Sequence, residues 1–184
     1  MTICPRDNFL PQRPFAFSVG KASVLVVFLC VSGTSAVAQI SLDNPDWAET
    51  EVPPPPAVDM SKLIRFEGAG SSSLTYGLDP STLRFSSSDG LARYVLVATS
   101  VTGASNVMYE AIRCSTAEFK TYARYTISEG RWNPVANAQW RSMLGNMPSK
   151  HALHLARAGV CDGAAPTGNV NEVIRRLTVR NTRD

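Results

Sequence analysis

The stretch NVMYEAIRC, residues 106–114, decides how this chain is interpreted. It mixes the strand-type residues Val107, Met108, Tyr109 and Ile112 with charged ones, which predicts a β-strand whose side chains alternate between the two faces of a sheet. The strand also carries Glu110 and Arg113, and it ends on Cys114. These three residues either form a functional site or hold the strand in place.

Turn signals on both sides of this strand predict an antiparallel β-meander. The pair Asp89-Gly90 favours a hairpin, because type I′ turns need positive φ at both central residues. Residues 102–105 and 115–117 supply two further turns. If each hairpin closes on its turn, Phe85 lies opposite Tyr94, Ala98 opposite Tyr109, and Tyr109 opposite Ala123. One sheet face then collects most of the apolar side chains. This set is Leu83, Phe85, Tyr94, Leu96, Ala98, Val107, Tyr109, Ala111, Phe119, Ala123 and Tyr125.

The opposite face of the predicted sheet is half apolar, so another part of the chain should cover it. Residues 135–144, residues 148–159 and, more weakly, residues 167–180 have the apolar spacing and end signals of short helices. The predicted class is α+β: an antiparallel β-meander of about five strands with two or three short C-terminal helices.

The N-terminus has the pattern of a cleaved signal peptide. Arg6, Arg13 and Lys21 precede an apolar run, residues 22–31, which is about half the roughly 20 residues that span a bilayer. The sequence Ala36-Val37-Ala38 then follows, an A-x-A cleavage pattern. We therefore expect residues 1–38 to be removed after Ala38 and the mature protein to be exported rather than membrane-spanning.

Cleavage leaves 146 of the 184 residues, the size of one domain, with 15 basic and 14 acidic side chains. This balance offers no basic stripe for nucleic acid. Only Cys114 and Cys161 remain, and two cysteines in an exported chain predict a disulfide. A metal site would need further cysteines, so no metal and no cofactor is expected.

Residues 39–60 differ in composition from residues 61–184, which form the predicted domain. Residues 39–60 contain four consecutive prolines, which favour an extended, semi-rigid spacer. Binding of a partner with an aromatic groove is the alternative for this Pro-rich arm. Trp47 has a reason to dock back onto the domain, since a tryptophan is seldom left in water.

Catalytic patterns are weak in the mature chain. No G-x-S-x-G motif accompanies the only two histidines, His151 and His154, so a serine hydrolase is not predicted. The histidines are spaced to share a metal, but no third ligand accompanies them, and both are interpreted as surface residues.

A polar cluster is the one candidate site. The predicted register places Glu110, Lys120 and Arg124 on one sheet face, with the two cations diagonal to the carboxylate. They form either an anion or substrate site or an ion cluster that fixes the register, with Glu110 paired to one or both cations. Arg113 is expected to lie over the ring of Tyr94 or Phe119.

Several segments together resemble the cryptic neisserial protein 1-like family. They are DGLARYVLVATSVTGASNVMYEAIRC, residues 89–114, then FKTYA, residues 119–123, and Trp132, Trp140 and Cys161. The resemblance spans about residues 46–177, and Asn106, Glu110, Arg113 and Cys114 match its most specific motif.

The resemblance implies a small exported protein of Gram-negative bacteria, hence a periplasmic one. It brings no established activity and no catalytic residue. We therefore expect a non-enzymatic envelope accessory or binding domain with an unknown partner. The alternative is a small enzyme with a site around Glu110, Lys120 and Arg124.

Overall fold

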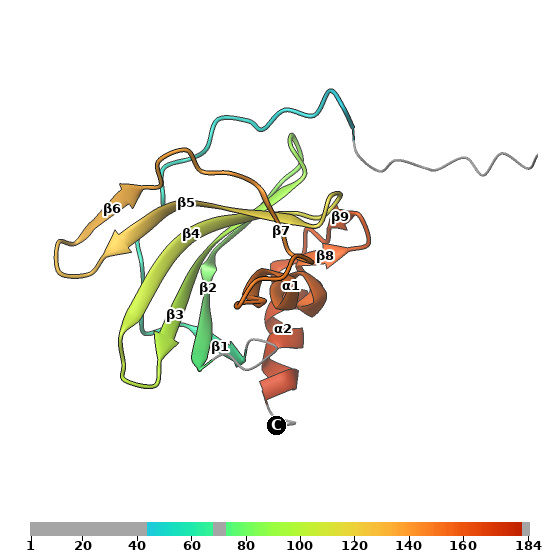
Figure 1. The fold of residues 1–184 in the computed structure, drawn as a ribbon. Helices are drawn as coiled ribbons and strands as arrows, with labels where there is room; N and C mark the ends of the chain where they lie inside the picture. Colours follow the sequence, from blue (N-terminus) through green and yellow to red (C-terminus); the bar gives the residue numbers. More distant parts are fainter. Residues whose placement is uncertain (1–43, 68–72, 182–184) are drawn as a thin grey trace, which may run out of the picture. The chain divides into compact units, whose positions relative to one another are not determined.

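The computed structural model describes residues 44–67 and 73–181. The predicted signal peptide lies outside the described residues. A seven-stranded antiparallel sheet runs in the order β1 to β6, with β7 paired to β5 (Figure 1). Its strands are β1 (Ile64–Glu67), β2 (Leu74–Ser86), β3 (Leu91–Ser100), β4 (Ser105–Arg113), β5 (Glu118–Thr126), β6 (Arg131–Pro134) and β7 (Arg141–Ser142).

The C-terminal part supplies two helical segments and a small hairpin. Helix α1 (His151–Leu155) continues into a π-helical turn, η1 (Ala156–Val160), and α2 (Val170–Asn181) follows the hairpin of β8 (Cys161–Asp162) and β9 (Ala165–Pro166). The antiparallel meander with short C-terminal helices is therefore confirmed, although the described part of the chain holds more strands than expected.

The helix predicted at residues 135–144 is wrong. The chain there forms a loop, and β7 pairs with β5 through Phe119 and Arg141. Asn137 has a φ of 50°, in the left-handed region, where a right-handed helix cannot continue.

The predicted pairing of β3 with β4 is also wrong. Ala98 lies opposite Asn106, not opposite Tyr109, because the hairpin closes on the three residues 101–103. Gly103 makes this tighter loop possible with a φ of 87°. A shift of three positions is odd, so it turns β4 over relative to β3 and breaks up the predicted apolar face.

The first hairpin departs from its prediction by an even number of positions. Its loop is longer than the Asp89-Gly90 pair, so Phe85 lies opposite Ala92 instead of Tyr94. Because an even shift preserves facing, Phe85 stays on the same face as Tyr94.

The third hairpin pairs Tyr109 with Ala123 as predicted, but a β-bulge follows. Glu110 therefore lies opposite Thr121, not opposite Tyr122. Tyr122 and Ala123 both pack on one side of the sheet, next to Tyr109. The β-bulge therefore determines which face of the sheet each neighbouring β5 side chain, such as Lys120 or Thr121, lies on.

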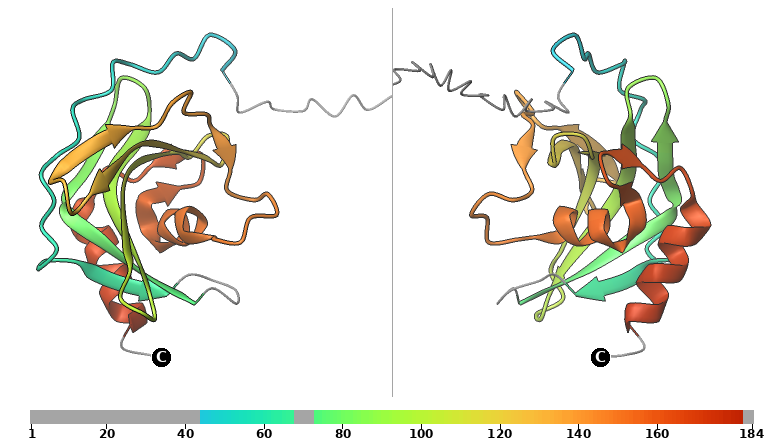
Figure 2. Two further views of the ribbon diagram at one scale, coloured as in Figure 1. Left: turned by 60° about the vertical axis from the view of Figure 1, so that its left-hand side comes forward. Right: turned by 90° about the vertical axis from the view of Figure 1, so that its right-hand side faces the viewer.

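Both faces of the sheet are covered. The helix face packs on α1, η1 and α2, and it includes Tyr94, Leu96, Met108, Ile112 and Phe119. The arm face packs on the N-terminal arm, and it includes Val95, Val97, Val107, Tyr109 and Ala111. Figure 2 shows the sheet curving around α1, with the extended arm along its outer side.

The predicted disulfide is confirmed. Cys114 and Cys161 are bonded, with their Cα atoms 5.6 Å apart and a sequence separation of 47. The bond fastens the end of β4 to the start of β8, where the π-helical turn ends. It therefore ties the sheet to the helical segment that lies on the helix face.

Candidate functional site

Glu110 is fully buried on the helix face, and its carboxylate is held by three hydrogen-bond partners. Thr121 Oγ1 donates to Oε1 at 2.7 Å, and Tyr94 donates its hydroxyl to Oε2 at 3.3 Å. His151 Nε2 lies 2.8 Å from the same Oε2. A buried carboxylate with this many partners is fixed in position, as a functional acid or a structural ion must be.

The hydrogen bonds continue beyond His151. Ser149 Oγ lies 2.6 Å from His151 Nδ1, and the Tyr76 hydroxyl lies 2.7 Å from Ser149 Oγ. The His151 ring stacks on Tyr76, with centroids 5.3 Å apart, and meets the edge of Phe119. Strand β4, the start of α1 with the residue Ser149 before it, and strand β2 thus contribute to one series of hydrogen bonds: Glu110, His151, Ser149 and Tyr76.

The electrostatics favour an ionised Glu110. Burial works to raise the pKa of Glu110, but the electrostatic interaction with His151 and hydrogen bonds from His151, Thr121 and Tyr94 outweigh it and lower that pKa. Burial and the neighbouring Glu110 carboxylate raise the pKa of Tyr94 well above its usual range. Tyr94 therefore stays a neutral donor to a charged acceptor.

A cavity of about 190 Å³, here called the concave cavity, opens beside these hydrogen-bonded residues. Its apolar lining is Leu74, Ala98, Met108 and Met147, and its polar lining is Tyr76, Asn106, Glu110, Thr121, Arg124, Arg141, Ser149 and His151. Arg124 and Arg141 are exposed, and Arg141 also lies over the Phe119 ring. Neither arginine forms an ion pair within the described part of the chain. The cavity therefore offers uncommitted positive charge next to an apolar wall.

The structure separates the predicted polar cluster. Glu110 and Arg124 line the same cavity, but Lys120 and Arg113 lie on the arm face. The expected pairing of Glu110 with Lys120 or Arg124 is wrong, because its carboxylate contacts His151 instead. His151 is itself buried rather than a surface residue.

Lys120 and Arg113 instead hold the arm. Lys120 Nζ lies 2.7 Å from Glu49 Oε2, and the Tyr122 hydroxyl donates to the other oxygen of Glu49. The Arg113 guanidinium lies 3.7 Å from the centroid of the Trp47 ring, not over Tyr94 or Phe119.

Asp89 anchors the arm from the sheet side. Trp47 donates its indole N–H to the Asp89 carbonyl at 2.8 Å, and Thr50 donates its hydroxyl to the Asp89 carboxylate at 2.6 Å. That carboxylate also pairs with Arg93 at 2.6 Å. Burial works to raise the pKa of Asp89, but the hydrogen bonds from Arg93, Ser86 and Thr50 lower it well below its usual range.

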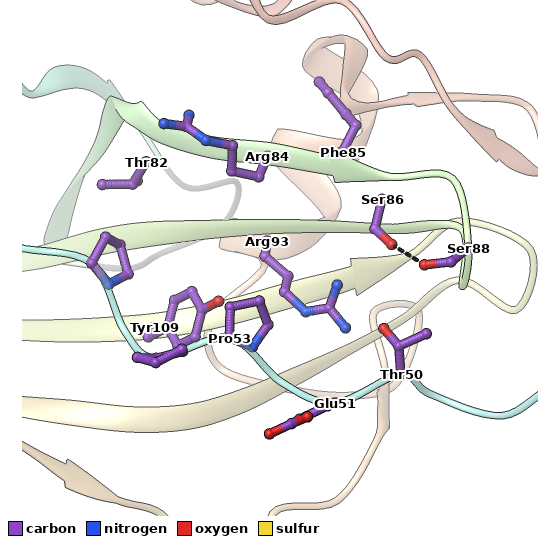
Figure 3. Close-up of a pocket in the computed structure, with 12 residues that line it drawn as sticks. Thr50, Glu51, Pro53, Thr82, Arg84, Phe85, Ser86, Ser88, Arg93 and Tyr109 are labelled. Carbon is purple, nitrogen blue, oxygen red and sulfur yellow. Dashed lines mark hydrogen bonds between the residues drawn. The ribbon is translucent and has the colours of Figure 1, made fainter.

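A second cavity, of about 370 Å³, lies between the arm and the sheet and is called the arm cavity. Figure 3 shows Thr50 and Pro53 of the arm on one side of it and Arg84 and Phe85 of β2 on the other. Arg93 also lines it, but its charge is already paired with Asp89. The arm cavity therefore has less free charge to offer an ionic ligand than the concave cavity.

Sequence reasoning missed Ser149, Tyr76 and Glu49. Ser149 precedes a predicted helix, which suggested only a helix start. Glu49 is acidic and lies close to Trp47 in a segment interpreted as a spacer. An acidic, aromatic-containing arm beside a domain with basic strand residues was the one available signal.

Among residues 44–67 and 73–181, no group of three or more His, Cys, Asp or Glu side chains is arranged to hold a metal ion. His154 therefore does not join His151 in such a group.

In the same ranges, no helix is long and apolar enough to cross a membrane.

Comparison with protein families matches residues 42–178 to the CNP1-like family, in agreement with the resemblance in the sequence motifs. Comparisons with curated proteins and with solved structures gave no match. The family match covers most of the chain, including every strand of the sheet and both the Glu110 and the Glu49 contacts. The chain belongs to the CNP1-like family.

Proposed function

We propose that this protein is exported to the periplasm and acts there as a binding domain for a small organic anion. The ligand is held in the concave cavity, where its charged group meets Arg124 and Arg141. The observation that carries this proposal is the combination of two exposed, uncommitted arginines with an apolar wall in one cavity.

The dimensions of the concave cavity limit the ligand. Its volume of about 190 Å³ equals the liquid volume of about six water molecules. A short-chain carboxylate is of suitable size. Its alkyl part would contact Met108 and Met147, and its carboxylate would accept hydrogen bonds from the guanidinium groups.

Export is supported by the signal-peptide pattern of residues 1–38 and by the disulfide, since disulfides persist in oxidising compartments. The test is N-terminal sequencing of protein from a periplasmic fraction, which should begin at Gln39. Protein that stays in the cytoplasm with residues 1–38 attached would contradict export.

Anion binding is tested by calorimetric titration of the mature protein with acetate, butyrate, hexanoate and inorganic phosphate. We expect a carboxylate of intermediate length to bind more tightly than acetate, because it also fills the apolar part of the cavity. The double variant Arg124→Gln, Arg141→Gln should lose at least tenfold in affinity, since a hydrogen bond to a charged group contributes about 1.5–3 kcal/mol.

Arg131→Gln is the matched control, because Arg131 pairs with Glu129 at the turn between β5 and β6 and does not line the cavity. Its affinity should equal that of the wild type. If no carboxylate or phosphate binds, or if the double variant binds as well as the control, the concave cavity is not an anion site.

A further inference from the structure

The chain of hydrogen bonds beside the concave cavity has the parts of an activated nucleophile. Nucleophilic catalysis by serine requires a base within hydrogen-bond reach of the hydroxyl and a third group that orients the base. Ser149 Oγ lies 2.6 Å from His151 Nδ1, and Glu110 Oε2 lies 2.8 Å from His151 Nε2. Ser149 also lines a cavity in which a substrate could lie.

We propose that Ser149 is a nucleophile and that the concave cavity hydrolyses small carboxylic esters. This inference deepens the proposed function and rests on it in one respect: the carboxylate held by the cavity is then the product of the reaction. The base is His151, and Glu110 is a positioning residue that acts through it.

The hydrogen-bond contacts of a neutral His151 match the tautomer that the reaction needs. An ionised Glu110 accepts a hydrogen bond from Nε2–H of His151, which leaves Nδ1 as a lone-pair acceptor. The Ser149 hydroxyl then donates to Nδ1, and the Tyr76 hydroxyl, 2.7 Å away, donates to Ser149 Oγ. One direction of donation therefore satisfies the whole chain.

The acid is held more firmly than a surface carboxylate would be. Thr121 Oγ1 fixes its other oxygen at 2.7 Å, and no part of the Glu110 side chain reaches solvent. The His151 ring is confined between Tyr76 and Phe119. Orientation of this kind keeps one tautomer and one ring position, which is the role of the acid in a serine–histidine–acid arrangement.

The order of the two ring nitrogens is the reverse of that in chymotrypsin-like enzymes, where Nε2 faces the serine and Nδ1 the acid. The reversal does not change the chemistry, because either imidazole nitrogen can accept a proton while the other donates to a carboxylate. Such an arrangement is recognised by geometry and roles. Here Ser149 and His151 are two positions apart, so the short segment before α1 sets their separation.

The reaction balances with water as the only co-reactant. Ser149 Oγ attacks the ester carbonyl carbon, its proton passes to His151 Nδ1, and the carbonyl oxygen becomes an oxyanion. Collapse of this intermediate breaks the bond to the leaving oxygen, which takes the proton from Nδ1 and departs as an alcohol. Water then attacks the acyl-serine, gives its proton to Nδ1 and releases the carboxylic acid, while Ser149 Oγ regains that proton.

Positive charge in the cavity suits the intermediates. Arg124 and Arg141 are the uncommitted cations that line it, and donors directed at a developing oxyanion contribute strongly to catalysis. The acyl group would lie on Leu74, Ala98, Met108 and Met147. The substrate class is therefore an ester of a short, unbranched acid.

The test uses an alkyl fluorophosphonate, which reacts with activated serines, on the folded mature protein. We expect one adduct, located at Ser149 by peptide mapping, and hydrolysis of p-nitrophenyl butyrate with an initial burst of nitrophenol. Ser149→Ala should lose both signals. Ser88→Ala, which removes a serine in the β2–β3 loop, should keep both.

A folded wild-type protein that gives no adduct, or an adduct elsewhere, overturns the inference. If Ser149→Ala proves unstable, peptide mapping of the wild-type adduct decides alone, because only an adduct on Ser149 supports the inference. The proposals fail separately: butyrate binding without labelling removes only the hydrolase, and labelling without butyrate binding removes only the anion site.

Discussion

Trp47 lies outside the predicted domain in sequence, yet it makes three kinds of contact with the sheet and its loops. Its indole N–H donates to the Asp89 carbonyl at 2.8 Å. Its ring lies under the Arg113 guanidinium at 3.7 Å, and it meets Trp140 edge-on with centroids 5.8 Å apart. We therefore expect Trp47→Ala to destabilise the folded domain.

The magnitude follows from these contacts. The hydrogen bond contributes about 1 kcal/mol. The cation–π contact contributes about 1 kcal/mol at a half-buried position, and the aromatic pair about 0.5–1 kcal/mol. The expected loss in the free energy of unfolding is about 3 kcal/mol, at the lower end of the range for removal of a buried aromatic side chain.

Thermal unfolding followed by circular dichroism measures this loss. For a domain of this length, about 3 kcal/mol lowers Tm by about 6–12 °C. Trp47→Phe should lose less, because it removes the hydrogen bond but keeps a ring for Arg113. Val101→Ala, at the 87% exposed tip of the β3–β4 hairpin, is the neutral control. A Tm for Trp47→Ala within about 2 °C of the control would refute the reasoning and leave the arm a spacer.

The remaining predictions concern the disulfide, the buried acid and one glycine. Replacing Cys114 and Cys161 by serine should lower the free energy of unfolding by about 4 kcal/mol for the 47-position loop in denaturant titrations; unchanged stability would contradict this. Because the pKa of Glu110 is lowered in the folded state, its contribution is present above the ordinary value of 4.5 and is lost as pH falls through the folded pKa. Glu110→Gln should therefore cost about 3 kcal/mol at pH 7 and flatten the acid limb of the stability curve; an unaltered acid limb would argue against an ionised Glu110. Gly159→Ala should cost about 1–3 kcal/mol in the same titrations, since the φ is 110° and the new Cβ would lie 3.0 Å from Arg176 Cδ; wild-type stability would show that the backbone relaxes.

The strands could be predicted because the signals for a strand are local in the sequence. The disulfide could be predicted because only one pair of cysteines was available. Residues 106–114 are rich in β-branched and aromatic residues and are bounded by turn signals, which defines a strand without reference to its partners. Once residues 1–38 are set aside as the predicted signal peptide, only Cys114 and Cys161 remain to pair. The turns were also located correctly, although each loop differed in length from its prediction.

The register could not be predicted because both faces of the sheet are buried. Residues 91–98 of β3 are buried without interruption, so no polar alternation shows which side faces water. With an apolar face on either side, a shift of three positions in β4 exchanges one hydrophobic surface for another. Only the geometry of the Gly103 loop selects the observed pairing.

The candidate site was predicted in part for the same reason. Glu110 was singled out correctly as a charged residue needing an explanation, but its partner His151 is 41 positions away in sequence and belongs to a helix. The β5 bulge was not visible in the sequence, and it places Arg124 on the helix face while Lys120 faces the arm. One extra residue therefore divided a cluster that strict alternation had joined.

Glu110, Arg113 and Cys114 consequently have different roles, because β4 separates two environments. Even-numbered side chains, Glu110 among them, face the helices and the concave cavity, whereas odd-numbered ones, including Arg113, face the arm. Cys114, on the helix side, attaches the end of β4 covalently to Cys161 at the start of β8. A defect in arm docking should therefore act on the concave cavity only through β4. Substitutions of Trp47 and of Ser149 should have nearly additive effects on the free energy of unfolding, since the two residues share no hydrogen-bond partner.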